Sequence, residues 1–214
     1  SEEIPEDVTE KKESAERFLS QEDLGNVCYV TAVNLVQAGE FEKAYPFIDN
    51  SLTIQPELTL SWLYKGFIHH NRKECEEAIT CFDKVLAKDP FQIRAWLFKG
   101  YSLFHLHQDD KALECFDRVI KEDRKQLRAI VYKGYCLKNL KRYKEAGNAF
   151  DNAIQLSPTD LNLRLNRGLC LFEDKQFYDA HNAFVKVLEL DKRTLSARLY
   201  KIHRILKLYR NQQA

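Results

Sequence analysis

Four glycines recur at intervals of 34 residues, and this period is the strongest constraint on what the chain can fold into. They are Gly66, Gly100, Gly134 and Gly168. Each lies in an apolar stretch, where glycine costs a helix about 1 kcal/mol relative to alanine. Their recurrence therefore indicates a packing requirement that is repeated along the chain. Alanines keep the same step, as do bulky residues four positions later: Ala44, Ala78, Ala112, Ala146 and Ala180, then Ile48, Phe82, Phe116, Phe150 and Phe184.

Each 34-residue unit is predicted to form a helical hairpin. In residues 93–126, apolar residues fall at helical spacing over 93–106 and 109–122, and the polar sequence HQDD separates the two runs. Neither helix can bury its apolar face alone, but stacked hairpins form a continuous core. The glycine at the eighth position and the alanine at the twentieth would let paired helices approach closely. The phenylalanine would fill the space beside them.

This pattern resembles the tetratricopeptide-repeat family. The family's signature of aromatic, glycine, alanine, aromatic and proline reads here as Trp62, Gly66, Ala78, Phe82 and Pro90. The register defines five repeats, numbered 1 to 5 below: 25–58, 59–92, 93–126, 127–160 and 161–194. The resemblance implies an all-α fold, a right-handed superhelical solenoid of stacked helix-turn-helix repeats. Departures are local, with Cys28 and Ala32 in place of tryptophan and glycine in repeat 1 and Arg164 at the usually apolar fourth position of repeat 5.

Two segments of opposite charge flank the repeats. Residues 1–24 contain nine acids and three bases, a net charge of −6, and residues 7–20 are predicted to form a short capping helix. Residues 191–214 contain seven bases and one acid, a net charge of +6. Residues 195–214 are predicted to form a basic helix, either a cap or a truncated sixth repeat.

Composition excludes several classes of function. The formal net charge is only +1, so no global field favours nucleic acid or anionic lipid. The six cysteines form no CxxC pair, the acidic start is unlike a secretory signal, and no apolar run is long enough for membrane insertion. We therefore expect a reducing, cytoplasmic setting. His69, His70, Cys75 and Cys81 match no common zinc pattern, and no phosphate loop or nucleophile motif is present, so we expect no metal, no cofactor and no catalytic residue.

A cation precedes each glycine, and an acid recurs at the twenty-fifth position. Two interpretations are open, a row of phosphate-binding cations or a ladder of ion pairs between neighbouring repeats. The ladder is favoured because the seventh position lies roughly opposite the fifth, which faces the concave side in the family. The expected pairs are Lys65–Asp49, Lys99–Asp83, Lys133–Asp117 and Arg167–Asp151.

The resemblance implies that a ligand would lie on the concave face, lined by positions 2, 5, 6, 9, 12 and 13 of each repeat. These positions hold many aromatic residues and two arginines, which are types favoured at interfaces. The alternative is that some rings only pack between repeats. The candidate groove residues are Tyr64, Phe67, Arg94, Phe98, Tyr101, Arg128, Tyr132, Tyr135 and Asn166.

The function that the sequence favours is a non-enzymatic scaffold that binds a protein or peptide in an aromatic and basic groove. Family members that clamp a C-terminal carboxylate have lysine at the fifth position and asparagine at the ninth, and this chain has neither. Two alternatives remain open. The chain could form homo-oligomers through its oppositely charged termini, or it could be an adaptor domain of a larger protein.

Overall fold

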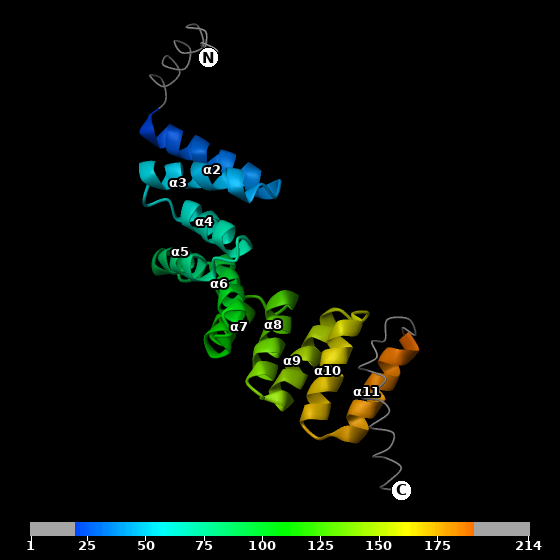
Figure 1. Cartoon of the computed structure of the whole chain (residues 1–214). Coiled ribbons are helices and arrows are strands. Elements are labelled where there is room, and N and C mark those ends of the chain that lie inside the picture. Colours follow the sequence, from blue (N-terminus) through cyan, green and yellow to red (C-terminus); the bar gives the residue numbers. More distant parts are fainter. Residues whose placement is uncertain (1–19, 191–214) are drawn as a thin grey trace. The chain divides into compact units, whose positions relative to one another are not determined.

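The computed structural model describes residues 20–190, which form ten helices and no strand (Figure 1). Contacts divide the chain into two compact units, unit 1 up to Phe98 and unit 2 from Lys99. The helices are α2 Gln21–Gln37, α3 Phe41–Ile54, α4 Thr59–Asn71, α5 Cys75–Lys88, α6 Ile93–His105, α7 Asp109–Glu122, α8 Leu127–Asn139, α9 Tyr143–Leu156, α10 Leu161–Glu173 and α11 Phe177–Leu190.

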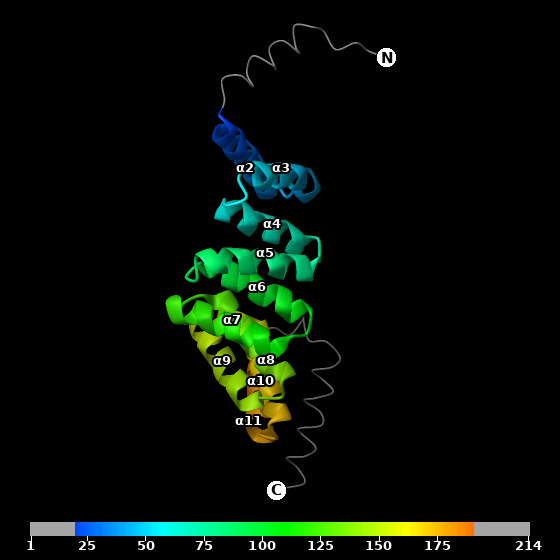
Figure 2. The same ribbon diagram turned by 90° about the vertical axis from the view of Figure 1, so that its left-hand side faces the viewer.

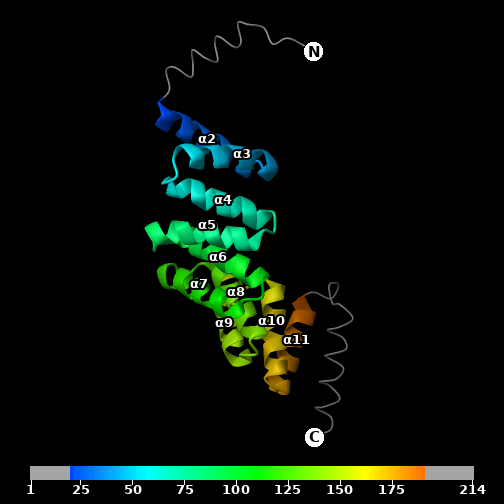
Figure 3. The same ribbon diagram turned by 60° about the vertical axis from the view of Figure 1, so that its left-hand side comes forward.

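Successive helices pack on one another within each unit. In unit 1, α3, α4 and α5 lie in order along the stack (Figures 2 and 3). In unit 2, α8, α9, α10 and α11 lie side by side (Figure 1). The apolar runs predicted at 93–106 and 109–122 correspond to α6 and α7. Hairpin formation therefore follows the 34-residue register.

The turn inside each hairpin has a fixed conformation at the fifteenth position of the repeat. Gly39 has a positive φ of 78°, and four residues in the same register have φ values between 56° and 65°: Lys73, His107, Lys141 and Lys175. A left-handed residue just after a helix is the usual way to end it. Side chains with a Cβ adopt this conformation at some cost, so hairpin packing must stabilise it in four of the five repeats.

The recurring glycine packs directly against the recurring phenylalanine of the same repeat. A Cβ added at Gly66, Gly100 or Gly168 would lie 2.7 Å from a ring atom of Phe82, Phe116 or Phe184, and one at Gly134 would lie 2.9 Å from Phe150. All four rings are fully buried, as are the alanines at the twentieth position. The packing requirement that the sequence indicated for the recurring glycine is therefore close contact with the phenylalanine ring of the same repeat.

Repeat 1 replaces this contact with a complementary one. Ala32 stands at the glycine position and Ile48 at the phenylalanine position, and both are fully buried in one apolar cluster. The side chain gained at Ala32 is compensated by the smaller side chain opposite. The departure therefore preserves the core.

The first described helix begins at a well-formed cap. The Ser20 hydroxyl accepts a hydrogen bond from the Asp23 amide at 3.1 Å, and the Asp23 carboxylate accepts one from the Ser20 amide at 3.1 Å. This reciprocal pair is a capping box. Ser20 is thus a cap and not the end of a preceding helix. The rest of the helix expected at 7–20, and the one expected at 195–214, lie outside the described residues.

We predict that Gly134→Ala lowers the free energy of unfolding by about 1–3 kcal/mol, because the new methyl group overpacks the buried ring of Phe150. Adding Phe150→Ile should restore part of this loss by recreating the pair found in repeat 1. Urea unfolding followed by circular dichroism would measure both effects.

Gly147→Ala is the matched control. Gly147 lies in the same hairpin, but its nearest contact for a new Cβ is Arg167 Nη1 at 3.5 Å, an ordinary separation. This substitution should be neutral or stabilising because alanine favours a helix. Equal effects of the two alanine substitutions would contradict the proposed role of the ring contact.

Candidate functional site

A groove in unit 1 contains four of the predicted ligand-binding residues. It has a volume of about 400 Å³ and lies among α2, α4 and the first turns of α6. Every lining residue occupies one of the six positions expected to face a ligand: Val36, Gln37, Leu63, Tyr64, Phe67, Arg94 and Phe98. The register therefore places these side chains together although they come from three repeats.

The groove combines an aromatic wall with one cation. The rings of Phe67 and Phe98 meet edge to face with centroids 4.9 Å apart, and Tyr64 meets Tyr29 edge to face at 5.8 Å. Arg94 is exposed, and no acidic side chain in residues 20–190 forms an ion pair with it. The arrangement can hold an apolar side chain against the rings while the guanidinium binds a carboxylate.

Three residues that line the groove are absent from the candidates predicted from the sequence, because those candidates were mainly aromatic and charged residues. Val36 and Gln37 occupy the twelfth and thirteenth positions of repeat 1, and Leu63 occupies the fifth position of repeat 2. The register alone would have found them. They are small or neutral, so they supply shape to the groove and no charge.

Unit 2 holds a cluster of packed rings at the same register positions. Tyr132 lies at its centre, with ring centroids 4.5 Å from Tyr101, 5.2 Å from Phe104 and 5.9 Å from Tyr135. Tyr101 is only 6% exposed. Burial raises the pKa of Tyr101 to about 12, although the Arg128 guanidinium opposes this shift. Tyr101 thus packs between repeats, as the alternative interpretation allowed, while Arg128 is exposed.

Lys138 and Asn166 form a polar pair next to this cluster. Lys138 Nζ donates a hydrogen bond of 2.9 Å to Asn166 Oδ1 and lies 5.2 Å from the ring centroid of Tyr135. Burial raises the pKa of Tyr135 as well. Lys138 stands at the twelfth position of repeat 4, so the register could have identified it as a neighbour of Asn166.

The structure forms three of the expected ion pairs between repeats. The distances are 2.5 Å for Lys65–Asp49, 2.6 Å for Lys133–Asp117 and 2.7 Å for Arg167–Asp151. The fourth expected pair, Lys99–Asp83, would join the two units and stays a prediction. Three cations of the recurring row therefore already have carboxylate partners, which disfavours the interpretation as a phosphate track.

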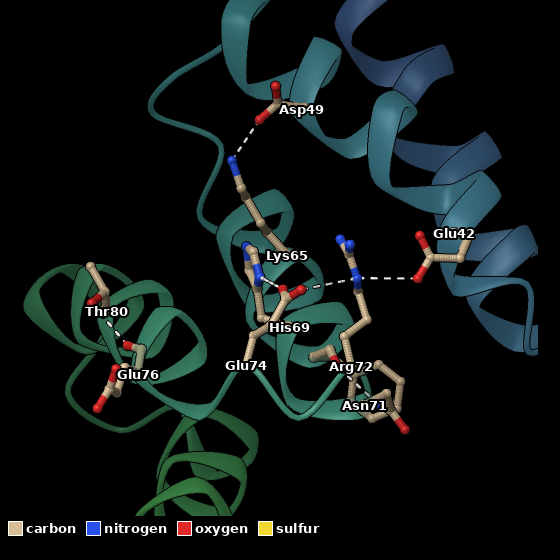
Figure 4. A network of polar contacts seen from close by, with 10 residues as sticks. Glu42, Asp49, Lys65, His69, Asn71, Arg72, Glu74, Glu76 and Thr80 are labelled. Atoms are coloured by element: carbon tan, nitrogen blue, oxygen red, sulfur yellow. Dashed lines mark hydrogen bonds and ion pairs between the residues drawn. The ribbon is translucent and has the colours of Figure 1, made fainter.

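A second set of polar contacts in unit 1 lies beside the Lys65–Asp49 pair (Figure 4). The carboxylate of Glu74 contacts His69 Nδ1 at 2.6 Å and Arg72 Nε at 3.3 Å, and Arg72 Nε lies 3.2 Å from Glu42. Buried His69 thus has a carboxylate partner that joins the end of α4 to the start of α5. Among residues 20–190, no group of three or more histidine, cysteine and acidic side chains is placed to hold a metal ion.

Comparison with known proteins agrees with this architecture. The family described as anaphase-promoting complex, cyclosome, subunit 3 matches residues 71–153. The comparison with curated protein sequences gives no match. Among solved structures, MamA residues 41 to the end from Desulfovibrio magneticus RS-1 is 21% identical, with a TM-score of 0.75, and the match covers 81% of this chain and 98% of that one.

Two further structures are similar over most of this chain. YrrB, described as a TPR protein with an unusual peptide-binding site, is 19% identical with a TM-score of 0.75, and the match covers 94% of this chain and 97% of that one. PilF from Pseudomonas aeruginosa is 15% identical with a TM-score of 0.68, covering 90% of this chain and 87% of that one. The chain has the tetratricopeptide-repeat fold.

The tetratricopeptide-repeat fold explains the placement of the cysteines. All six are free thiols, and five are buried: Cys75, Cys81, Cys115, Cys136 and Cys170. Burial raises the pKa of Cys81 and Cys170 to about 11 and that of Cys136 to about 12. These thiols occupy packing positions of the repeat and behave as small apolar side chains. Within residues 20–190, each helix is too short or too polar to cross a bilayer.

We predict that the free energy of unfolding falls as pH rises above about 9. The buried thiols and Tyr101 have raised pKa values in the folded chain, so the unfolded chain loses these protons first. Their stabilising contribution is complete below the unfolded pKa values and is lost as pH approaches 11 to 12. Urea unfolding at a series of pH values would measure the slope.

The slope of the unfolding free energy against pH is set by the number of protons released on unfolding. Cys136→Ala should reduce that number by about one per molecule, whatever its effect on stability at pH 7. Identical slopes for Cys136→Ala and the parent chain would show that burial of this thiol does not govern its titration.

Proposed function

We propose that the chain is a non-catalytic scaffold that binds a peptide segment of a partner protein in the unit 1 groove. The peptide would place an apolar side chain against Tyr64, Phe67 and Phe98 and a carboxylate against Arg94. The observation that supports this most directly is the convergence of three aromatic side chains and one exposed arginine on a groove of about 400 Å³. Aromatic residues and arginine dominate binding energy at protein interfaces.

The groove chemistry favours an acidic and apolar peptide over the ligands of the carboxylate-clamp type. The fifth positions of the repeats are Tyr29, Leu63, Leu97, Val131 and Leu165, so the lysine of the clamp is missing. In unit 2, exposed Arg128 lies four residues before Tyr132 and seven before Tyr135 on α8, so the same face of that helix offers a cation and rings. A peptide with a carboxylate and spaced apolar side chains suits each of these two surfaces.

The fold supports the same class of function. Tetratricopeptide repeats generally serve as interaction scaffolds, and YrrB, which is similar in structure, is described as having an unusual peptide-binding site. No nucleic-acid partner is proposed, because the net charge of +1 offers no basic field. The alternative of self-assembly through charged termini depends on residues 1–19 and 191–214, which lie outside the described residues.

We predict that Arg94→Ala weakens binding of peptides selected from a random library on the immobilised chain by about tenfold. A charge-assisted hydrogen bond contributes about 1.5–3 kcal/mol, and 1.4 kcal/mol corresponds to a factor of ten. Arg94→Glu should weaken acidic peptides further. Isothermal titration calorimetry would give the affinities.

Lys43→Ala is the matched control, because Lys43 is an exposed cation of unit 1 whose partner is Glu40 on the same helix end. It should leave the affinity unchanged. A library that yields no binders, or binders indifferent to Arg94, would contradict the proposed site.

A further inference from the structure

A second groove lies in unit 2, on the side of the repeats that holds the ion-pair ladder. Its volume is about 790 Å³, and it lies among α7, α8 and α9. Ile120, Ile130, Leu137, Ala149 and Leu156 form its apolar floor. Asn148, Asn152 and Gln155 add three amide side chains along α9. The groove is therefore shaped for an apolar group flanked by polar ones.

The groove opens where repeat 4 lacks a side chain that other repeats possess. In repeats 2 and 3 the fourth position is tryptophan, and its Nε1–H donates a 2.8 Å hydrogen bond to the proline carbonyl six residues earlier, in Trp62–Pro56 and Trp96–Pro90. In repeat 5 Arg164 Nη2 donates to the carbonyl of Pro158 at 2.5 Å. An indole or guanidinium thus covers the junction between repeats in all three cases.

Repeat 4 has Ile130 at this position and Arg124 in place of the proline. An aliphatic side chain cannot donate a hydrogen bond, and none of residues 20–190 donates one to the carbonyl of Arg124. Ile130 is 5% exposed and forms part of the groove floor instead of a cover. The site therefore retains the acceptor of the tryptophan contact and lacks its donor.

The cation that packs on the tryptophan ring is also replaced. In repeat 2, Lys84 Nζ lies 3.6 Å from the ring centroid of Trp62. The residue in the same register of repeat 4 is Asn152, which lines the groove. Arg124, Ile130 and Asn152 thus stand where Pro56, Trp62 and Lys84 form their contacts, and all three line this groove.

The charges of the groove leave a positive surplus at its α7 side. Asp117 pairs with Lys133 at 2.6 Å, and Glu145 pairs with Arg142 at 2.7 Å. Lys121 and Arg124 are exposed lining residues, and within residues 20–190 no acid pairs with either. A ligand that carries carboxylates beside its apolar group would complement these two cations.

We propose that this groove binds an acidic peptide segment of a partner protein that inserts a tryptophan side chain. The indole covers Ile130 and donates its N–H to the carbonyl of Arg124, as Trp62 and Trp96 do to theirs. Flanking carboxylates of the peptide bind Lys121 and Arg124. This surface is separate from the unit 1 groove, and the proposal does not rest on peptide binding there.

The test uses the synthetic peptide acetyl-Glu-Asp-Gly-Trp-Gly-Asp-Glu-amide with 5-fluorotryptophan as its aromatic residue. Fluorine NMR reports the peptide alone, so Trp62 and Trp96 do not interfere. We expect the fluorine signal to shift and broaden on titration with the full chain. The same peptide with leucine in place of tryptophan should compete at least tenfold less well.

Two variants locate the bound peptide. Ile130→Trp fills the groove with the chain's own indole and should weaken binding at least tenfold while leaving the thermal unfolding midpoint unchanged or higher. Lys121→Glu combined with Arg124→Glu changes only exposed residues, so it keeps the test decisive if Ile130→Trp does not fold. This pair should also weaken binding at least tenfold.

Lys111→Glu combined with Lys144→Glu is the charge-matched control, because these exposed residues lie on α7 and α9 outside the groove lining. It should retain most of the binding. Equal affinity for the tryptophan and leucine peptides, or equal loss with both charge-reversal pairs, would overturn the proposal. Loss with Arg94→Glu but not with Lys121→Glu and Arg124→Glu would place the peptide in the unit 1 groove and overturn it as well.

Discussion

In repeats 2 to 5, the contact between the glycine at the eighth position and the phenylalanine at the twenty-fourth determines how the hairpin presents its surfaces, and Ala32 with Ile48 takes its place in repeat 1. The ring of Phe150, for example, is fully buried, and a Cβ at Gly134 would lie only 2.9 Å from it. The first helix therefore cannot rotate about its axis without a clash or a void. Its orientation points positions 2, 6 and 9 to one side and positions 4 and 7 to the other. Both grooves depend on this constraint.

Much of the unit 1 groove could be predicted from the sequence because its residues share register positions. Tyr64, Phe67, Arg94 and Phe98 come together since a 34-residue period puts equivalent faces next to each other. The ion pairs were predictable for the same reason, as position 7 lies beside position 25 of the preceding repeat. The burial of Tyr101 was not, because it depends on how closely Tyr132 and Phe116 pack against the ring.

Departures from the repeat pattern differ in whether the chain compensates for them. Ala32 at a glycine position is matched by Ile48, which leaves room for the extra methyl group. Arg164 at a tryptophan position still donates a hydrogen bond to the Pro158 carbonyl. In the first case the smaller side chain of Ile48 restores close packing. In the second case the guanidinium of Arg164 replaces the indole N–H as the hydrogen-bond donor. Neither departure could have been interpreted from a single position of the sequence.

Ile130 is a departure without such compensation in the described residues. The sequence shows that tryptophan is missing there, but only the structure shows that the carbonyl it would bind remains in place and that no neighbouring side chain closes the gap. The same backbone carbonyl recurs at each of these junctions between repeats. Where no side chain donates a hydrogen bond to it, the carbonyl is available to water or to a donor from another molecule. The apolar floor around Ile130 favours a donor attached to an aromatic ring over water alone. A surface on the ladder side of unit 2 can thus originate from an omitted side chain, whereas the unit 1 groove originates from side chains that are present at the expected register positions.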